Sequence, residues 1–65
     1  MEKFYCEVYS NGYSSFFIIN ADKKPKYDDI VAIAVRENRV GHPDDVEDAK
    51  VITEQEYMTA MEGDK

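Results

Sequence analysis

The chain has 65 residues with 14 acidic and 8 basic side chains, which gives a formal net charge of −6 at pH 7. This length predicts a single domain over residues 1–65, and a composition of 43% hydrophobic and 34% charged residues excludes a disordered or fibrous chain. The longest unbroken apolar run, residues 30–35, is far shorter than the roughly 20 residues of a membrane-spanning helix, so no membrane partner is expected.

The single cysteine, Cys6, has no second cysteine with which to form an intramolecular disulfide. Residues 2–9 begin directly with a strand-like pattern and lack the apolar core of a signal peptide, so we expect a cytoplasmic protein in a reducing compartment. A core of this size also has no room to enclose a cofactor pocket of about 300 Å³. We therefore expect no cofactor and a function carried by the outer surface.

Residues 3–19 predict a β-hairpin. Residues 3–9 alternate between two faces, and residues 16–19 form a second short apolar run. Asn11 and Gly12 stand between these runs, a pair typical of the type I′ turn, which needs positive φ at both central residues.

A two-residue loop also determines which side chains share a face. It places Cys6 opposite Phe17, and their face also holds Phe4, Val8 and Ile19. The other face holds Tyr5, Tyr9, Phe16 and Ile18. Both faces of the hairpin are therefore apolar enough to need cover.

Residues 27–38 predict a helix of about three turns. Asp28 and Asp29 supply carboxylates to its first turn, where the helix dipole favours negative charge. Its apolar stripe contains Ile30, Ile33 and Ala34, with Val31 beside it. The high Ile and Val content leaves a strand over residues 30–35 as the alternative, but the acidic start and Arg36 near the end favour the helix.

After a Gly-His-Pro break, residues 43–46 predict one helical turn and residues 49–52 a third strand. Thr53 and Glu56 then have the spacing of a capping box. In this motif the Thr53 hydroxyl caps the Glu56 amide, and the Glu56 carboxylate reaches back to the Thr53 amide. The pair predicts a second helix that runs to about Glu62.

The element order is β-β-α-β-α, which predicts an α+β fold with a three-stranded antiparallel or mixed sheet and helices packed on it. A right-handed crossover through the first helix makes the third strand parallel to the second and antiparallel to the first. We favour the strand order 2-1-3, with that helix on the face of Phe4, Cys6 and Val8. The second helix has two alternative positions, beside the first helix or over the opposite face of the hairpin.

No residue pattern in the chain is typical of an enzyme. Cys6 alternates into the core face, where cysteine is inert, and His42 lies in a solvated loop, so no nucleophile and base are expected to meet. The chain has no Gly-rich phosphate loop, HExxH helix or nucleophile elbow. The carboxylates after His42 lack the spacing of a calcium loop and the further imidazole or thiolate of a transition-metal site. We therefore expect neither catalytic residues nor a metal site.

Residues 27–65 carry eleven acidic and four basic side chains, an excess that repels phosphate, so direct nucleic-acid binding is not expected. Acidic side chains on a rigid domain instead match a basic, nucleic-acid-binding groove in another protein, as in small inhibitors encoded by phages and mobile elements. We predict a non-enzymatic, acidic protein-interaction module of this inhibitor type; the ordinary alternative is that the acidic residues only keep the domain soluble. The partner-binding candidates, expected in a loop and at the start of the first helix, are Asp44, Asp45, Glu47, Asp48, Asp28 and Asp29.

Aromatic residues are concentrated near the start of the chain, where six of the eight fall within residues 1–17. Tyrosine is common at interfaces because it buries a large area and keeps a polar tip. The face with Tyr5, Tyr9 and Phe16 is therefore a second candidate binding surface. Two alternatives remain for it: the face pairs with its copy in a structural homo-oligomer such as a homodimer, or the second helix covers it.

Overall fold

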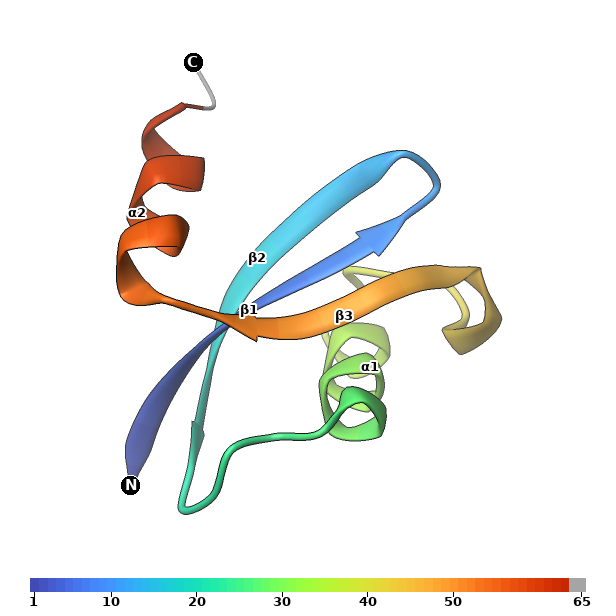
Figure 1. The fold of residues 1–65 in the computed structure, drawn as a ribbon. Helices are drawn as coiled ribbons and strands as arrows, with labels where there is room; N and C mark the ends of the chain where they lie inside the picture. The colour runs from blue at the N-terminus through green and yellow to red at the C-terminus, as the bar shows by residue number, and fades with distance from the viewer. Residues whose placement is uncertain (64–65) are drawn as a thin grey trace.

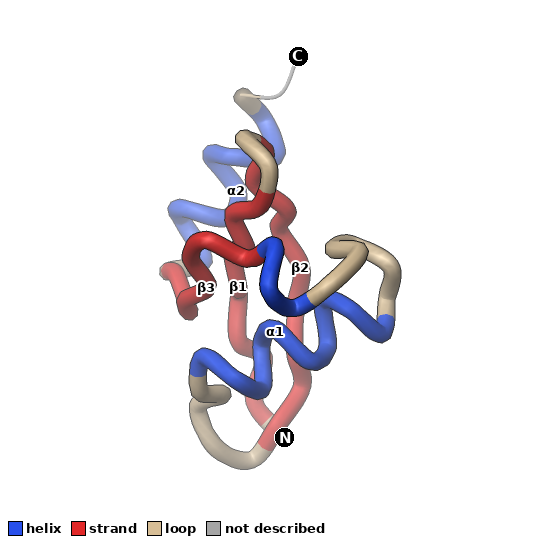
Figure 2. The backbone as a smooth tube through the Cα atoms, turned by 90° about the vertical axis from the view of Figure 1, so that its right-hand side faces the viewer, coloured by secondary structure: helices blue, strands red, loops and turns tan. Residues whose placement is uncertain are grey.

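The computed structural model describes residues 1–63, which contain three strands and two α-helices in the predicted order β-β-α-β-α (Figure 1). The elements are β1 (Glu2–Ser10), β2 (Tyr13–Ala21), α1 (Tyr27–Arg36), the short 3₁₀ helix η1 (Pro43–Asp45), β3 (Val46–Ile52) and α2 (Glu54–Glu62). The protein is therefore a small α+β fold in which the two α-helices lie on opposite faces of one sheet (Figure 2).

β1 is the central strand of the sheet and runs antiparallel to both of its neighbours, in the order β2-β1-β3. This arrangement confirms the predicted strand order. Asn11 and Gly12 form the hairpin turn with φ angles of 54° and 82°, as the type I′ turn requires. The predicted register is also confirmed, because Cys6 lies opposite Phe17 and the other pairs follow in the same frame.

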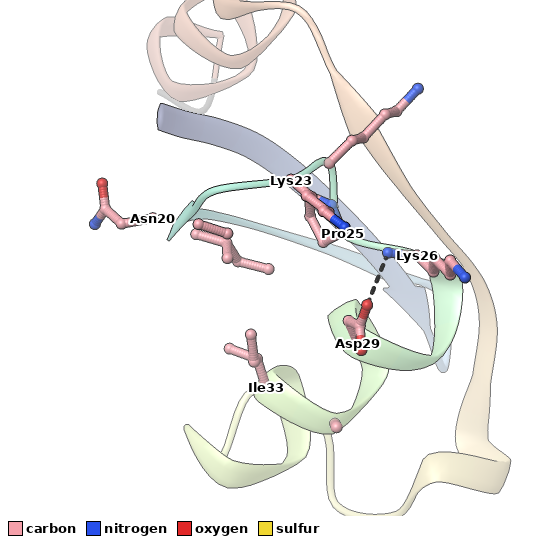
Figure 3. Close-up of a pocket in the computed structure, with 10 residues that line it drawn as sticks. Asn20, Lys23, Pro25, Lys26, Asp29 and Ile33 are labelled. Atoms are coloured by element: carbon pink, nitrogen blue, oxygen red, sulfur yellow. Dashed lines mark hydrogen bonds between the residues drawn. The ribbon is translucent and has the colours of Figure 1, made fainter. Parts of the chain in front are cut away.

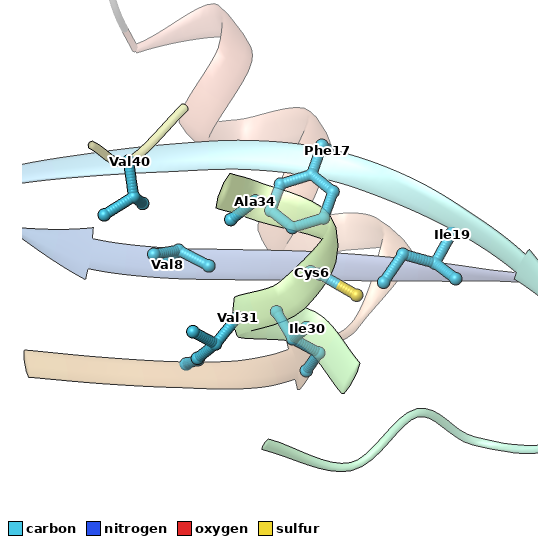
Figure 4. Close-up of a cluster of buried hydrophobic side chains, with 9 residues drawn as sticks. Cys6, Val8, Phe17, Ile19, Ile30, Val31, Ala34 and Val40 are labelled. Carbon is cyan, nitrogen blue, oxygen red and sulfur yellow. The ribbon is translucent and has the colours of Figure 1, made fainter. Parts of the chain in front are cut away.

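α1 covers one face of the sheet and forms the hydrophobic core with it (Figure 4). Ile30, Val31 and Ala34 are the buried residues of α1, and Cys6, at 0% exposure, lies in the same cluster. The other buried core residues are Val8, Phe17, Ile19, Val40 and Ala49. Ile33, which belongs to the predicted apolar stripe, is only partly buried.

The end of α1 is closed by a left-handed turn that no sequence pattern predicted. Asn38 has a φ of 61°, and its N–H donates to the Val35 carbonyl at 3.1 Å. The next N–H, of Arg39, donates to the Ala34 carbonyl at 2.9 Å, which completes a Schellman motif. The turn redirects the chain toward the sheet, so that Val40 enters the core and is only 5% exposed.

α2 lies on the opposite face of the sheet from α1, which decides between its two predicted positions (Figure 2). The predicted capping box is confirmed: the Glu56 N–H donates to Thr53 Oγ1 at 3.0 Å, and the Thr53 N–H donates to Glu56 Oε1 at 2.9 Å. Hydrogen bonds from Thr53, first of all from its backbone N–H, hold the pKa of the Glu56 carboxyl below its ordinary value. Tyr57 packs on Tyr5 with ring centroids 5.0 Å apart. No residue of α2 is buried, so the helix covers this face incompletely.

β3 is longer than predicted, because it begins at Val46 rather than at residue 49. Val46 pairs with Ser10 and Asp48 pairs with Tyr9, with an irregularity in the register between them. The prediction that Glu47 and Asp48 lie in a loop was therefore wrong, since both are strand residues. Acidic residues have a low strand propensity, and pairing with β1 overrides that propensity here.

Thr53→Ala should lower the melting temperature, because it removes the hydroxyl that accepts the Glu56 N–H. Loss of such a cap costs about 1 kcal/mol, which in a domain of this size corresponds to about 4–8 °C. Thr53→Ser keeps the hydroxyl and should melt close to the unaltered protein. Thr59→Ala, at an exposed position within α2, is the matched control. Equal melting temperatures for Thr53→Ala, Thr53→Ser and the unaltered protein would show that this cap does not stabilise the helix.

Phe17→Ala should destabilise the fold more than Phe16→Ala, since the two side chains lie on opposite faces of β2. Phe17 is 3% exposed in the core, and removal of a buried ring costs about 3–5 kcal/mol. Phe16 is only partly buried on the α2 side of the sheet, so its loss should cost less. Urea unfolding of both variants measures the two free energies. A larger loss for Phe16→Ala would contradict the assigned faces.

Candidate functional site

The net charge of the protein is confined to its last third. Residues 1–42 carry six acidic and six basic side chains, whereas residues 43–63 carry seven acidic side chains and only Lys50 as a basic one. Four of these seven form what we call the acidic edge, on η1 and the first half of β3: Asp44, Asp45, Glu47 and Asp48. The β3 part of this segment pairs with the end of β1 that leads into the hairpin turn (right-hand side of Figure 1).

Hydrogen bonds hold the backbone of the acidic edge in one conformation. η1 begins at His42, whose Nδ1 accepts the Asp44 N–H at 3.1 Å. The Asp45 carbonyl accepts from the Ser10 hydroxyl at 2.9 Å, which ties η1 to the end of β1. The carboxylates therefore project from an ordered backbone rather than from a free loop.

Neighbouring cations do not neutralise the acidic edge. The His42 Nδ1 lies 3.7 Å from the Asp44 carboxylate and accepts the Asp44 backbone N–H at 3.1 Å. Lys50 also lies on β3, but its Nζ is 3.8 Å from Glu7 instead. Within residues 1–63, no Lys or Arg side chain forms an ion pair with the acidic edge. The Asp44 side chain is 91% exposed, so its charge faces solvent.

An exposed aromatic side chain adjoins the acidic edge. Tyr9 is the β1 partner of Asp48 and is 38% exposed. The other two predicted aromatic residues, Tyr5 and Phe16, share this face but are half-buried. Tyr5 donates from its hydroxyl to Glu54 Oε2 at 3.3 Å, and partial burial, followed by the nearby Glu54 charge, raises the pKa of Tyr5. Tyr9 is therefore the predicted aromatic residue that is most open to a partner.

The structure does not bring Asp28 and Asp29 together with the acidic edge. Both lie in the first turn of α1, where the Lys26 N–H donates to Asp29 Oδ2 at 3.1 Å and closes the start of the helix. Asp29 also borders a hollow beside the last residues of β2, at the end of the sheet away from the hairpin turn. Phe4, which pairs with Ile19 at the hollow, and Ser10, which pairs with Val46 at the acidic edge, are six residues apart on β1, or roughly 20 Å at about 3.4 Å per residue.

This hollow has a volume of about 460 Å³ and lies between the end of β2, residues 23–26 and α1 (Figure 3). We call it the lysine hollow, because residues 22–26 contribute three lysines to its border: Lys23, Lys24 and Lys26. The length of the chain predicted no enclosed pocket, and this open hollow was not predicted. The lysine cluster was its only sequence signal, since the apolar floor forms only when α1 packs beside β2.

The two residues considered for catalysis lie in different environments. Cys6 is fully buried, and burial raises the pKa of its thiol to about 11. Its Sγ donates to the Phe4 carbonyl at 3.6 Å, whereas His42 is exposed at the start of η1. Within residues 1–63, no group of three or more His, Cys, Asp or Glu side chains is placed to hold a metal ion. In the same part of the chain, no helix has the length and apolar character needed to cross a membrane.

Comparisons with protein-family models, with curated proteins and with solved structures found no match for this chain. The function of its surfaces therefore has to be inferred from their geometry and charge. Two surfaces of opposite charge are the candidate sites. The acidic edge lies at the hairpin end of the sheet, and the lysine hollow lies at the other end.

Cys6 should resist thiol reagents in the folded protein. Its burial and its raised pKa leave almost no accessible thiolate at pH 7. Labelling with an aromatic disulfide reagent, followed by absorbance, should therefore proceed only as fast as the protein unfolds and should become immediate in urea. Fast labelling without urea would contradict the buried position of Cys6.

Proposed function

We propose that this protein is a non-enzymatic binding module whose acidic edge occupies a basic, nucleic-acid-binding groove of a partner protein. The observation that carries the proposal is a set of carboxylates on a hydrogen-bonded backbone that have no Lys or Arg partner within residues 1–63. An unpaired surface charge gives up only water when it meets a partner, whereas a paired charge must first leave its own counter-charge. The acidic edge is therefore ready to engage basic side chains.

The order of this surface supports recognition of another rigid surface. A nucleic-acid-binding groove presents basic side chains at positions that match a regular row of phosphates. Carboxylates carried by a strand and a short helix lose little backbone entropy when they dock into such a groove. A module bound there competes with nucleic acid, so it acts as an inhibitor of the kind that phages and mobile elements encode. Such a partner is intracellular, and we accordingly place the module in the cytoplasm.

Tyr9 adds a short-range contact to the attraction between charges. Charged surfaces mainly speed association, whereas buried aromatic side chains slow dissociation. Tyr9 lies beside Asp48 and is 38% exposed, so a partner seated on the acidic edge also reaches its ring. The surface thus combines charge that steers a partner with an aromatic side chain that anchors it.

A homodimer that forms through the face of Tyr9 and Ile18 is the second candidate. Ile18 is 37% exposed and Tyr9 is 38% exposed, so α2 leaves part of this face uncovered. Sedimentation of the protein alone separates the two candidates. A monomer at micromolar concentration favours a foreign partner, whereas a dimer that Ile18→Ser abolishes favours self-association.

Neutralisation of the acidic edge should weaken partner binding and make it less sensitive to salt. The test variant carries Asp44→Asn, Asp45→Asn, Glu47→Gln and Asp48→Asn. The matched control has the same net charge and alters exposed residues elsewhere: Glu2→Gln, Asp22→Asn, Glu37→Gln and Glu62→Gln. A partner is captured from the source cells on the immobilised unaltered protein, eluted with double-stranded DNA and purified for kinetic measurement.

The association rate of the test variant should fall more than its dissociation rate rises, as expected for steering charges. The slope of log affinity against log salt should also become shallower, because screening at 0.15 M salt acts over about 8 Å. The matched control should bind like the unaltered protein. Unchanged affinity and salt slope in the test variant would contradict a role for the acidic edge. An equal loss of affinity in both variants would show that binding depends only on the net charge of the protein.

A further inference from the structure

The lysine hollow exposes apolar surface at the opposite end of the sheet from the acidic edge. Its floor includes Ile19, Ala21 and Ile33, and its volume of about 460 Å³ is within the range of ligand-binding clefts. In Figure 3, the side chain of Ile33 points from α1 toward the end of β2, and Pro25 lies on the other side of the hollow. Ile33 belongs to the apolar stripe of α1 yet is only partly buried, so part of that stripe is exposed at the hollow.

The strand beside the hollow has a free edge. β2 lies at one side of the sheet and, within residues 1–63, is hydrogen-bonded only to β1. The residues that close a two-residue hairpin, here Ser10 and Tyr13, bond to each other, and bonded and non-bonded pairs then alternate along the strands. This alternation directs the N–H and C=O groups of Ile18 and Asn20 outward, beside the lysine hollow. A further strand could therefore form backbone hydrogen bonds with β2 along this edge.

Positive charge borders the same part of the molecule. The three lysines of the hollow are exposed, and none of them forms an ion pair within residues 1–63. The one carboxylate at the hollow, that of Asp29, accepts the backbone N–H of Lys26 and not a lysine ammonium group (dashed line in Figure 3). The lysine charges are therefore available to an anionic ligand.

We propose that the lysine hollow and the free edge of β2 bind an extended peptide segment of a partner protein, one in which acidic residues flank an apolar side chain. The segment adds a strand to β2 at Ile18 and Asn20, places its apolar side chain in the hollow and brings its carboxylates to the lysines. A small anionic amphiphile would use the hollow and the lysines but would leave the strand edge unpaired. The acidic edge lies roughly 20 Å away, beyond the screening length of about 8 Å, so it does not repel such a peptide.

The probe for this site is the synthetic peptide acetyl-Asp-Glu-Val-Ile-Val-Glu-Asp-amide. In a strand, its glutamates share a face with the central isoleucine, and acidic residues at both ends accommodate either strand direction. One comparison peptide replaces the acidic residues with Asn and Gln. The other keeps them but carries N-methyl groups on its central Val-Ile-Val backbone, which removes the donors of an added strand. Calorimetry and two-dimensional NMR of the full chain measure binding.

The acidic peptide should bind and should shift the amide resonances of Ile18, Asn20 and Ile33, without a shift at the acidic edge. The neutral peptide should bind about tenfold more weakly, as expected for the loss of two or three exposed ion pairs. The acidic peptide should lose affinity to the same extent on the variant with Lys23→Gln, Lys24→Gln and Lys26→Gln. Lys50→Gln, which removes one lysine charge away from the hollow, is the control and should bind normally. The N-methylated peptide should not bind.

Several outcomes would overturn this proposal. Equal binding of the N-methylated peptide would show that the hollow accepts side chains or amphiphiles without an added strand. Equal binding of the neutral peptide, resonance shifts confined to other parts of the chain, or no binding at millimolar peptide would also contradict it. The lysine variant alters exposed side chains only, and a dispersed NMR spectrum verifies that it is folded. The proposal does not depend on the acidic edge, so each can fail without the other.

Discussion

Two successive residues with positive φ, Asn11 and Gly12, determine which side chains of the hairpin face α1 and which face α2. The tight turn sets one pairing of β1 with β2, and a shift of one residue would exchange Phe17 with Phe16 across the sheet. The pairing of β3 with β1 sets the register of β3, so that Ala49 points into the core. A chain this short has a thin core, and an error in this frame would leave too little apolar surface buried to support the fold.

The same frame places the two charged surfaces at opposite ends of the sheet. The start of β3 pairs with the hairpin end of β1, and the Ser10 hydroxyl of β1 donates to the Asp45 carbonyl of η1. The loop of residues 22–26 follows the other end of β2. A domain with a thin core cannot enclose a large ligand, but a rigid sheet can hold two open surfaces at a fixed distance from each other. Their separation of roughly 20 Å exceeds the screening length of about 8 Å at physiological salt. The charges of the two surfaces are therefore largely screened from each other.

Features that act through near neighbours were predictable from the sequence. The hairpin turn and the capping box at Thr53 are local patterns, and the acidic residues are visible as an excess of charge. The start of β3 at Val46 was missed, because the acidic residues that follow adopt a strand only through pairing with β1. Val40 and the lysine hollow were missed for a related reason. Val40 enters the core through the left-handed turn at Asn38, and the hollow joins residues of β2 and α1 that are distant in the chain.

α2 is the element that is least tied to the core, and this affects how the surfaces of the protein can vary. None of its residues is buried, and a helix of nine residues is too short to be stable alone in water. Its cap at Thr53 and the packing of Tyr57 on Tyr5 therefore keep it folded on the sheet. The side chains that it leaves exposed, among them Ile18, become more or less accessible when this packing changes. The core lies on the other face of the sheet, under α1. Substitutions on α2 should therefore alter which side chains are exposed on the α2 face more than they alter the stability of the fold.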